Sequence, residues 1–157
     1  MSQVAIGTYI SVQERDGRFT GEDFQNFHAG ETRTYEARDY MFAAFGFSGA
    51  AVDINGANIQ AQLVFGVNQL IMQTAQGWAD RFCVIRIQTV WLNPDNFDET
   101  DQKLVEVYSV LGFDHDNSRF ALRLGSPLDA VQSDVPRRVL TQRTVGVLPT
   151  TGNISFT

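Results

Sequence analysis

The stretch Arg81–Leu92, RFCVIRIQTVWL, decides how this chain folds. Side chains at every second position share one face of a β-strand, and here most of them are apolar. The run Asn93–Asn96, NPDN, ends the stretch, because Asn, Pro and Asp favour turns. We therefore predict a strand whose core-facing side carries Cys83, Ile85, Ile87, Thr89 and Trp91.

Two more alternating stretches follow, Lys103–Phe113 and Arg119–Leu124, and the polar run Asp114–Ser118 separates them. Three strands joined by polar turns predict an antiparallel meander with one face on the core. Arg119 and Arg123 are expected to point outward. The side chains expected inside are Val105, Val107, Ser109, Leu111 and Phe113 from the second strand, and Phe120, Leu122 and Leu124 from the third.

The sequence before this meander alternates less regularly. Thr32–Ala37 and Asn58–Phe65 are typical of strands. Met41–Ala51 is apolar but is interrupted by Gly46 and Gly49, which predicts a strand with a bend or bulge.

One segment changes period from two to that of a helix. Val67, Leu70, Ile71 and Thr74 are spaced i, i+3, i+4 and i+7. This spacing predicts a short α-helix with these four side chains on its buried face. Gly77 is expected to end the helix.

Two segments are expected to lie outside this scaffold. Residues 14–31 are polar and glycine-rich, which predicts a long loop or arm that carries Phe19, Phe24 and Phe27. Residues 126–157 hold three of the four prolines, which predicts an extended C-terminal arm. At 157 residues the chain has the size of a single domain, 1–157. The predicted fold class is mostly β, a β-sandwich or barrel-like set of antiparallel sheets, with one short α-helix and extended terminal arms.

Charge and hydropathy exclude several classes of protein. Twelve basic and eighteen acidic residues give a net charge of −6. This charge argues against a dedicated nucleic-acid binder and against attachment to an anionic membrane surface. The N-terminus lacks a basic segment followed by an apolar core, so no secretory signal is expected. The most apolar stretch, 41–52, is too short to cross a bilayer. We expect no specific nucleic acid and no membrane insertion.

The sequence predicts no catalytic residue, no metal site and no cofactor. Asp114-His115-Asp116 stands where a hairpin must turn, and a turn is favoured over a metal ligand set or an acid–base pair. The acidic run 95–101 lacks the spacing of an EF-hand calcium loop. Cys83 lies on the predicted core face, where a buried thiol is expected rather than a nucleophile. Two histidines and one cysteine cannot build a multi-His or Cys-rich metal site.

The order of these elements resembles that of one viral family. A strand and a short helix precede GWADRFCVIRIQTVWLNP (77–94), a paired strand follows, and FALRLGSPLDAVQSDVPRRVL (120–140) leads into the tail. This succession is similar to the N-terminal β region of the phage minor tail protein L family and related tail-tip hub proteins. The Ser-Pro break within Leu122–Pro127 and the element Pro136–Arg138 carry the match, which covers residues 40–140.

The chain departs from that family in one respect. Family members carry a C-terminal cysteine-rich part that holds an iron–sulfur cluster. A chain with one cysteine cannot supply four thiolate ligands. The resemblance therefore implies a shortened relative that keeps the β scaffold alone.

The resemblance implies a non-enzymatic structural subunit of a bacteriophage tail tip or baseplate. Such a subunit would form a homo-oligomeric ring, threefold or sixfold, that connects the tail tube or distal ring to the hub or fibres. Its partners would be other phage tail proteins, and its location the virion, after assembly in the host cytoplasm. The residues expected at its interfaces are Phe19, Phe24, Phe27, Arg137, Arg138, Arg143, Leu148 and Phe156.

An alternative reading is a small β-sandwich module that binds carbohydrate or a host surface. In that case Trp78 and Trp91 would form an exposed stacking platform. A third reading, a small hydrolase that uses the pair Asp114 and Asp116, lacks any further supporting motif.

Overall fold

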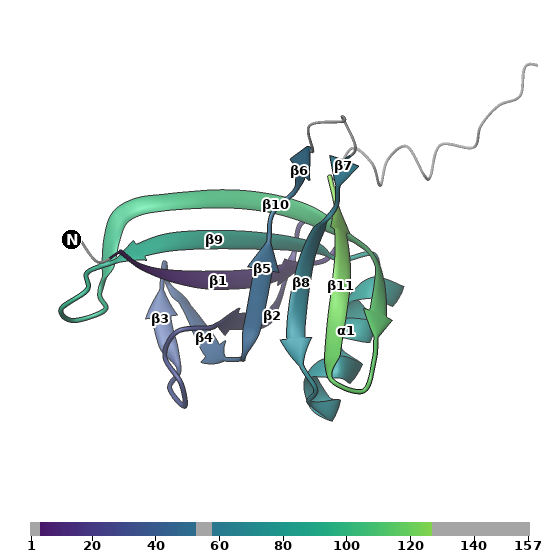
Figure 1. Ribbon diagram of the computed structural model, residues 1–157, viewed down its shortest axis with the longest axis horizontal. Coiled ribbons are helices and arrows are strands. Elements are labelled where there is room, and N and C mark those ends of the chain that lie inside the picture. The colour runs from purple at the N-terminus through teal and green to yellow at the C-terminus, as the bar shows by residue number, and fades with distance from the viewer. Residues whose placement is uncertain (1–3, 53–57, 127–157) are drawn as a thin grey trace, which may run out of the picture.

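The computed structural model describes residues 4–52 and 58–126 of the chain. It is mostly β, as the sequence predicts, with one α-helix beside a large mixed sheet (Figure 1). The nine strands of this sheet lie in the order β3-β4-β2-β1-β9-β10-β11-β8-β5, and β6 and β7 form a separate pair. The elements are β1 (Ala5–Gln13), β2 (Phe19–Gln25), β3 (Arg33–Tyr35), β4 (Arg38–Phe42), β5 (Phe45–Ser48), β6 (Ala51–Val52), β7 (Asn58–Ile59), β8 (Ala61–Gly66), α1 (Gln69–Asp80), β9 (Val84–Leu92), β10 (Glu99–His115) and β11 (Arg119–Gly125).

The sheet curls until its two ends meet at the chain segment that joins β4 to β5. β4 pairs in parallel with β2, whereas β5 pairs antiparallel with β8 at the far end of the strand order. Between them, the Ala43 N–H donates to the Gln25 carbonyl at 2.9 Å, and the Gly66 N–H donates to the Ala44 carbonyl at 3.4 Å. The interruption expected at Gly46 and Gly49 therefore begins earlier, at Ala43–Ala44, where the strand leaves one partner for another.

The helix packs on the core through a different face from the one predicted. α1 begins after Asn68, whose side-chain oxygen accepts from the Leu70 N–H, and Ala75 and Trp78 are its buried residues. Leu70 is 72% exposed, so the predicted face is wrong. Ile71, Ala75 and Trp78, which lie on one side of α1, pack against the core instead.

The end of the helix also differs from the prediction. Gly77 lies inside α1, which ends at Asp80 and is capped by Arg81, and Phe82 follows the cap with a φ of 51°. The Cys83 N–H donates to the Trp78 carbonyl at 2.9 Å and the Phe82 N–H to the Ala79 carbonyl at 3.2 Å. These two bonds form the usual capping arrangement at a helix C-terminus, here with Phe in the place where glycine is common.

The phase predicted for the central meander is right in β11 and in the first half of β9, and wrong in the first half of β10. At the end of β9, Thr89 and Trp91 are only half-buried, whereas Val90 and Leu92 on the opposite face are buried, which corrects the core face predicted there. Ile85, Ile87 and Leu122 are fully buried, as expected. Val107 is 43% exposed, and Tyr108 faces the core in its place because it pairs with Ile85 in register. An irregularity between residues 110 and 112 then reverses the alternation of β10. Phe113 consequently packs against the core as predicted.

Residues 14–31 are not one loop or arm, because Phe19–Gln25 forms β2 between β1 and β4. Phe24 is buried in the core, and the polar side chains Asp23 and Gln25 are buried on the other face of the sheet. A polar composition misled the prediction, since those polar groups have partners inside the protein. The C-terminal arm expected at 126–157 lies outside the described residues beyond Ser126.

Candidate functional site

A second, smaller core lies on the outer face of β1 and β9, under the hairpin formed by β3 and β4. Tyr9 is its centre: its ring stacks on Tyr35 at 4.6 Å between centroids and meets Tyr40 at 4.5 Å. Phe27 contacts the same ring edge-on at 5.2 Å. Val90 and Leu92 of β9 are buried in this cluster as well. Aromatic packing of this kind fixes the hairpin against the sheet.

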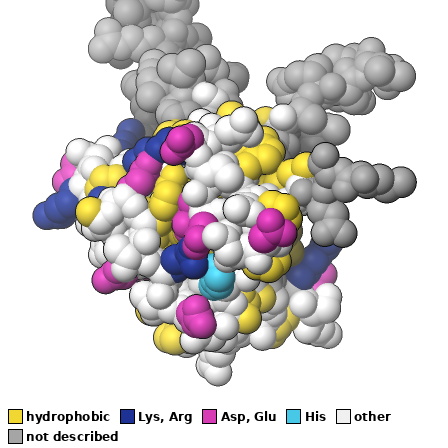
Figure 2. Space-filling model, turned by 90° about the vertical axis from the view of Figure 1, so that its left-hand side faces the viewer, with side chains coloured by type: hydrophobic (Ala, Val, Ile, Leu, Met, Phe, Trp, Pro, Cys, Tyr) yellow, Lys and Arg dark blue, Asp and Glu magenta, His cyan; other side chains and the backbone are white. Residues whose placement is uncertain are grey.

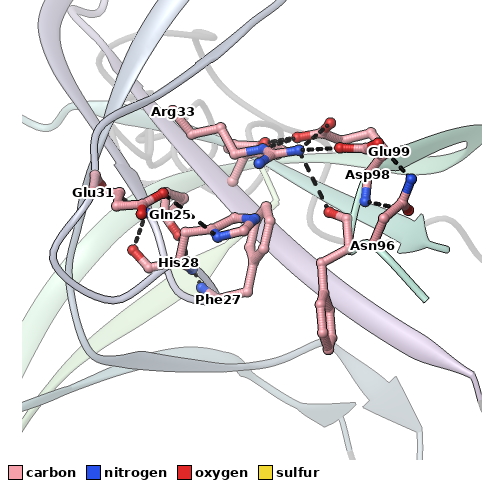
Figure 3. Close-up of polar contacts among 10 residues, drawn as sticks. Gln25, Phe27, His28, Glu31, Arg33, Asn96, Asp98 and Glu99 are labelled. Atoms are coloured by element: carbon pink, nitrogen blue, oxygen red, sulfur yellow. Dashed lines mark hydrogen bonds and ion pairs between the residues drawn. The ribbon is translucent and has the colours of Figure 1, made fainter. Parts of the chain in front are cut away.

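An ion pair closes one side of this cluster (Figure 3). The Arg33 Nε donates to Glu99 Oε1 at 2.7 Å and its Nη2 donates to Oε2 at 3.0 Å. The Tyr9 hydroxyl donates to the same Glu99 Oε1. Arg33 Nη2 also donates to Asp98 Oδ1 at 3.2 Å. The Arg33 guanidinium thus joins β3 to Glu99 at the start of β10 and to Asp98 in the loop before it.

The ion pair fixes the protonation of its members. Hydrogen bonding from Arg33 lowers the pKa of Glu99 to about 2. Burial, together with the Glu99 carboxylate, raises the pKa of the Tyr9 phenol. At neutral pH the carboxylate is therefore ionised and the phenol neutral, and neither group is poised to exchange protons with a substrate.

The tip of the hairpin is held by a second set of charges. Glu36 and Ala37 form the two-residue turn between paired Tyr35 and Arg38, and both have positive φ, 48° and 61°. Residues other than glycine adopt this conformation at an energetic cost. Glu36 accepts hydrogen bonds from Lys103 and, at 2.9 Å, from Gln88, and the Lys103 contact is the first cause that lowers its pKa. We call Tyr9, Arg33, Glu36, Glu99 and Lys103 the hairpin clamp.

A third polar group lies beside the clamp, between β1, β2 and β4. The Asp23 side chain is 6% exposed and meets Arg38 Nη1 at 3.3 Å. Burial raises the pKa of Asp23, and its Oδ1 is buried without a hydrogen-bond partner among the described residues. The Arg38 guanidinium lies 3.2 Å above the ring centre of Phe19. This arrangement anchors the start of β4, next to the turn of the hairpin, in the sheet.

The turn after β2 is organised by one buried amide (Figure 3). Gln25 Oε1 accepts from the N–H groups of Phe27 at 2.9 Å and His28 at 2.7 Å. Its Nε2 donates to the carbonyls of His28 at 2.7 Å and Glu31 at 3.1 Å. Gln25 thereby satisfies four backbone groups that the turn would otherwise leave unpaired.

These groups meet at one end of the molecule. Figure 2 views that end and shows acidic and basic side chains next to each other, with a histidine among them and hydrophobic side chains nearby. Two shallow hollows are found on the described surface, and the first of them adjoins the second core through Ala5. One of about 280 Å³ is lined by Val4, Ala5, Pro94 and Phe97, and the other, of about 530 Å³, lies beside Phe45 and Phe65. Neither is lined by a member of the clamp.

The structure gives the predicted interface aromatics roles inside the protein. Phe24 belongs to the main core, Phe27 packs on Tyr9, and Phe19 lies under Arg38. Phe24 is buried and cannot contact a partner, which corrects the expectation for this residue. Phe19 and Phe27 are half-buried, so their place at an interface stays a prediction. The remaining predicted interface residues fall outside the described residues: Arg137, Arg138, Arg143, Leu148 and Phe156.

The turn predicted at Asp114-His115-Asp116 is present but shorter and centres on Asp116, because Asp114 and His115 belong to β10 and pair with Ala121 and Phe120. Its Oδ1 accepts from the backbone N–H groups of Ser118 at 2.7 Å and Arg119 at 2.9 Å. Hydrogen bonding by Ser118 and Arg119 lowers the pKa of Asp116 to about 2. Cys83 is a free, buried thiol, and burial raises its pKa, which accords with a core residue.

Sequence reasoning missed the clamp itself. Arg33 and Glu99 lie 66 residues apart, and no spacing rule connects them. The acidic run 95–101 was the one feature of the sequence that pointed toward Glu99, but such a run by itself favours a solvated loop. Within residues 4–52 and 58–126, no group of three or more His, Cys, Asp or Glu is placed to hold a metal ion. In the same ranges no helix has the length and hydropathy needed to span a bilayer.

The charged side chains of the hairpin clamp thus hold the β3–β4 hairpin against β9 and β10. No known protein-family model matches the chain, and no curated protein sequence matches it either.

Proposed function

We propose that this chain is a non-enzymatic structural subunit of a bacteriophage tail tip or baseplate. In this proposal it forms a ring with copies of itself and joins the tail tube or distal ring to the hub or fibres. The observation that carries the proposal is a long strand, β10, whose first half presents apolar side chains to solvent. The sequence resemblance to the minor tail protein L family supplies the viral context.

Exposed apolar side chains occur on several parts of the described surface, and two of these parts lie on β10 and beside α1. On β10, Leu104, Val105 and Val107 are exposed, and beside α1, Leu70 and Phe82 are exposed. Groups of apolar side chains at a surface are typical of sites that contact other proteins. Two such areas suit a subunit that has a neighbour on each side, as in a ring.

The hairpin clamp supports a structural role in a different way. Its polar side chains pair with one another across β3, β9 and β10. The pKa of Glu99 is lowered to about 2, so its carboxylate stays ionised. A subunit that bears load in an assembly must present its contact surfaces at fixed positions. A clamped hairpin beside the projecting half of β10 meets that requirement without any catalytic group.

The alternative of a sugar-binding platform loses its main residue. Trp78 is fully buried, and its indole N–H donates to Glu22 Oε2 at 2.6 Å. Its ring therefore cannot stack on a ligand from solvent. No observation favours the carbohydrate reading over the structural one.

A deletion experiment in the phage that carries this gene tests the proposal. Deletion should yield particles with defective or missing tail tips, and a plasmid copy of the gene should restore infectious particles. Antibodies against the chain should label the tail end of complete virions in electron micrographs. Virions of normal morphology and infectivity that lack the chain would refute a structural role in the tail.

A further inference from the structure

Half of β10 is an open sheet edge. β10 pairs with β9 from Glu99 to Ser109 but with β11 only from Ser109 to His115. Among the described residues, no strand pairs with Lys103–Val107 on the side away from β9. Figure 1 shows this half of β10 arching beyond β11, with β9 along one side only.

The backbone of this edge is directed outward at alternate residues. The Val110 N–H donates to the Cys83 carbonyl, on the β9 side, at 3.0 Å. Backbone N–H and C=O groups alternate in direction along a strand. Those of Lys103, Val105 and Val107 therefore point away from β9. Val105 and Val107 are also 39% and 43% exposed. The edge thus offers hydrogen-bonding groups and apolar side chains together.

The usual protections of an edge strand are weak here. Natural edges carry proline, bulges or charged side chains that deter a further strand. Residues 103–107 contain no proline. Of their two charged side chains, Lys103 pairs with Glu36 in the clamp and Glu106 accepts a hydrogen bond from the Tyr108 hydroxyl. An open edge of this kind is a template for β-strand addition.

The chain's own β11 does not continue along this edge. β11 ends at Gly125, which pairs with Ser109, so the next positions would lie beside the free edge. Pro127 has no N–H and cannot extend a ladder there. The edge therefore remains available to a strand that comes from elsewhere.

Charge complementarity points to the C-terminal segment of a neighbouring copy. Residues 93–107 carry Asp95, Asp101 and Glu106, for which no ion pair is found among the described residues, whereas Asp98 and Glu99 pair with Arg33 and Lys103 pairs with Glu36. Residues 135–157 contain Arg137, Arg138 and Arg143 and no acidic residue. Within them, 137–148 is free of proline and rich in the β-branched residues that strands favour: Val139, Thr141, Thr144, Val145 and Val147.

We propose that residues 137–148 of one copy add as a strand to the Lys103–Val107 edge of β10 in the next copy. The proposal rests on the ring-forming role above, for which it supplies the subunit contact. Residues 126–136, which link β11 to this segment, can span about 36–40 Å when extended, far enough to reach a neighbour. No strand among the described residues pairs with this edge, and we assign the added strand to another copy rather than to the same one.

Disulfide trapping between two differently tagged full-length proteins tests this contact. One protein carries Val107→Cys, and the other carries cysteine in turn at each position from 138 to 147. Mild oxidation should link the two tags, and the yield should peak at every second position, because side chains on one strand face alternate with period two. A yield that is flat along the segment, or links confined to copies of one tag, would overturn the proposal.

Two controls make the outcome specific. Arg123→Cys, an exposed position on β11, should give at least tenfold less linked product than Val107→Cys. Val105→Pro removes an N–H that faces the free edge while sparing the β9 ladder, and it should also reduce linking at least tenfold with the far-ultraviolet circular dichroism unchanged. If that variant unfolds, Val105→Lys replaces it, with the same expected loss.

A further experiment distinguishes a strand added within one copy from a strand added between copies. It also allows this inference and the proposed function to fail separately. A double variant, Val107→Cys with Val139→Cys, should yield linked oligomers rather than an internally linked monomer, and a linked monomer would refute the assignment to a neighbour. If gene deletion abolishes tails but no link forms between copies, the proposed function survives and the strand addition fails. If copies link as expected but virions form without the chain, the strand addition survives and the proposed function fails.

Discussion

Arg33 of β3 and Glu99 at the start of β10 form a two-point ion pair across 66 residues of sequence, at 2.7 and 3.0 Å. Their side chains are only 22% and 18% exposed. A charge left alone at such a site would be poorly solvated, so each depends on the other. The pair therefore determines how firmly the hairpin is held beside the free edge of β10.

Replacing Glu99 with Gln should lower the free energy of unfolding by about 1–3 kcal/mol, because Arg33 loses a charged acceptor while the side-chain size is kept. Urea unfolding followed by circular dichroism measures the change. Asp95→Asn, at an exposed position in the loop just before Glu99, is the matched control and should stay within about 0.5 kcal/mol of the parent. An equal loss in both variants would show that the ion pair adds nothing specific.

Stability should fall in acid through the same residue. The pKa of Glu99 is about 2 in the folded protein against an ordinary 4.5, so the folded state binds this proton less tightly than the unfolded state. The stabilisation is therefore complete above about pH 4.5 and is lost as the pH falls toward 2, by up to about 3 kcal/mol. The raised pKa of Asp23 acts with the opposite sign.

Comparison of the parent with Glu99→Gln isolates this contribution, because Asp23 is present in both proteins and cancels. The difference in unfolding free energy between them should shrink steadily between pH 4.5 and pH 2. A difference that does not change with pH would mean that Glu99 titrates normally.

Gly7→Ala should destabilise the second core by about 1–3 kcal/mol, as overpacking does. A Cβ at Gly7 would lie 2.6 Å from Cδ1 of the Phe27 ring, whereas one at Gly46, also in a strand, meets nothing within 4 Å. Gly46→Ala is therefore the control and should be close to neutral in thermal unfolding. Adding Phe27→Leu should recover part of the loss only in the Gly7→Ala protein, and an additive double variant would argue against contact between the two residues.

Ile87→Ala and Val107→Ala should differ sharply, although both positions belong to apolar strands. Ile87 is fully buried, and its truncation should cost about 2–5 kcal/mol. Val107 is 43% exposed, so its truncation should cost less than about 0.5 kcal/mol in the isolated protein. Chemical unfolding of both variants gives the comparison, and similar losses would place Val107 in the core after all.

Local pattern predicted the strands whose two faces differ. In β9 and β11, large apolar residues alternate with other types at Ile85, Ile87 and Leu122, and these residues are buried as expected. In β10 both faces carry apolar residues, so alternation alone could not choose between Val107 and Tyr108. Pairing with β9 chose Tyr108, and the irregularity near Leu111 then reversed the phase.

Composition was a poor guide where polar residues are buried. β2 looked like a loop because Glu22, Asp23 and Gln25 interrupt its aromatics. In the folded chain, Arg38 meets Asp23, Trp78 donates to Glu22, and the turn after β2 satisfies Gln25. The candidate site was missed for the same reason, since its members come together only when β3 folds over β9 and β10.

The sequence by itself determined the mostly-β class, the central strands and the turn at Asp116, because these depend on alternation and on side chains that bond neighbouring backbone groups. Only the tertiary structure decided the clamp between Arg33 and Glu99, the closing of the sheet at Ala43–Ala44 and the open edge at Lys103–Val107. Those features depend on which strands become neighbours. Strand neighbours are fixed by the burial of the whole core, which joins residues too distant in sequence for any local pattern to pair.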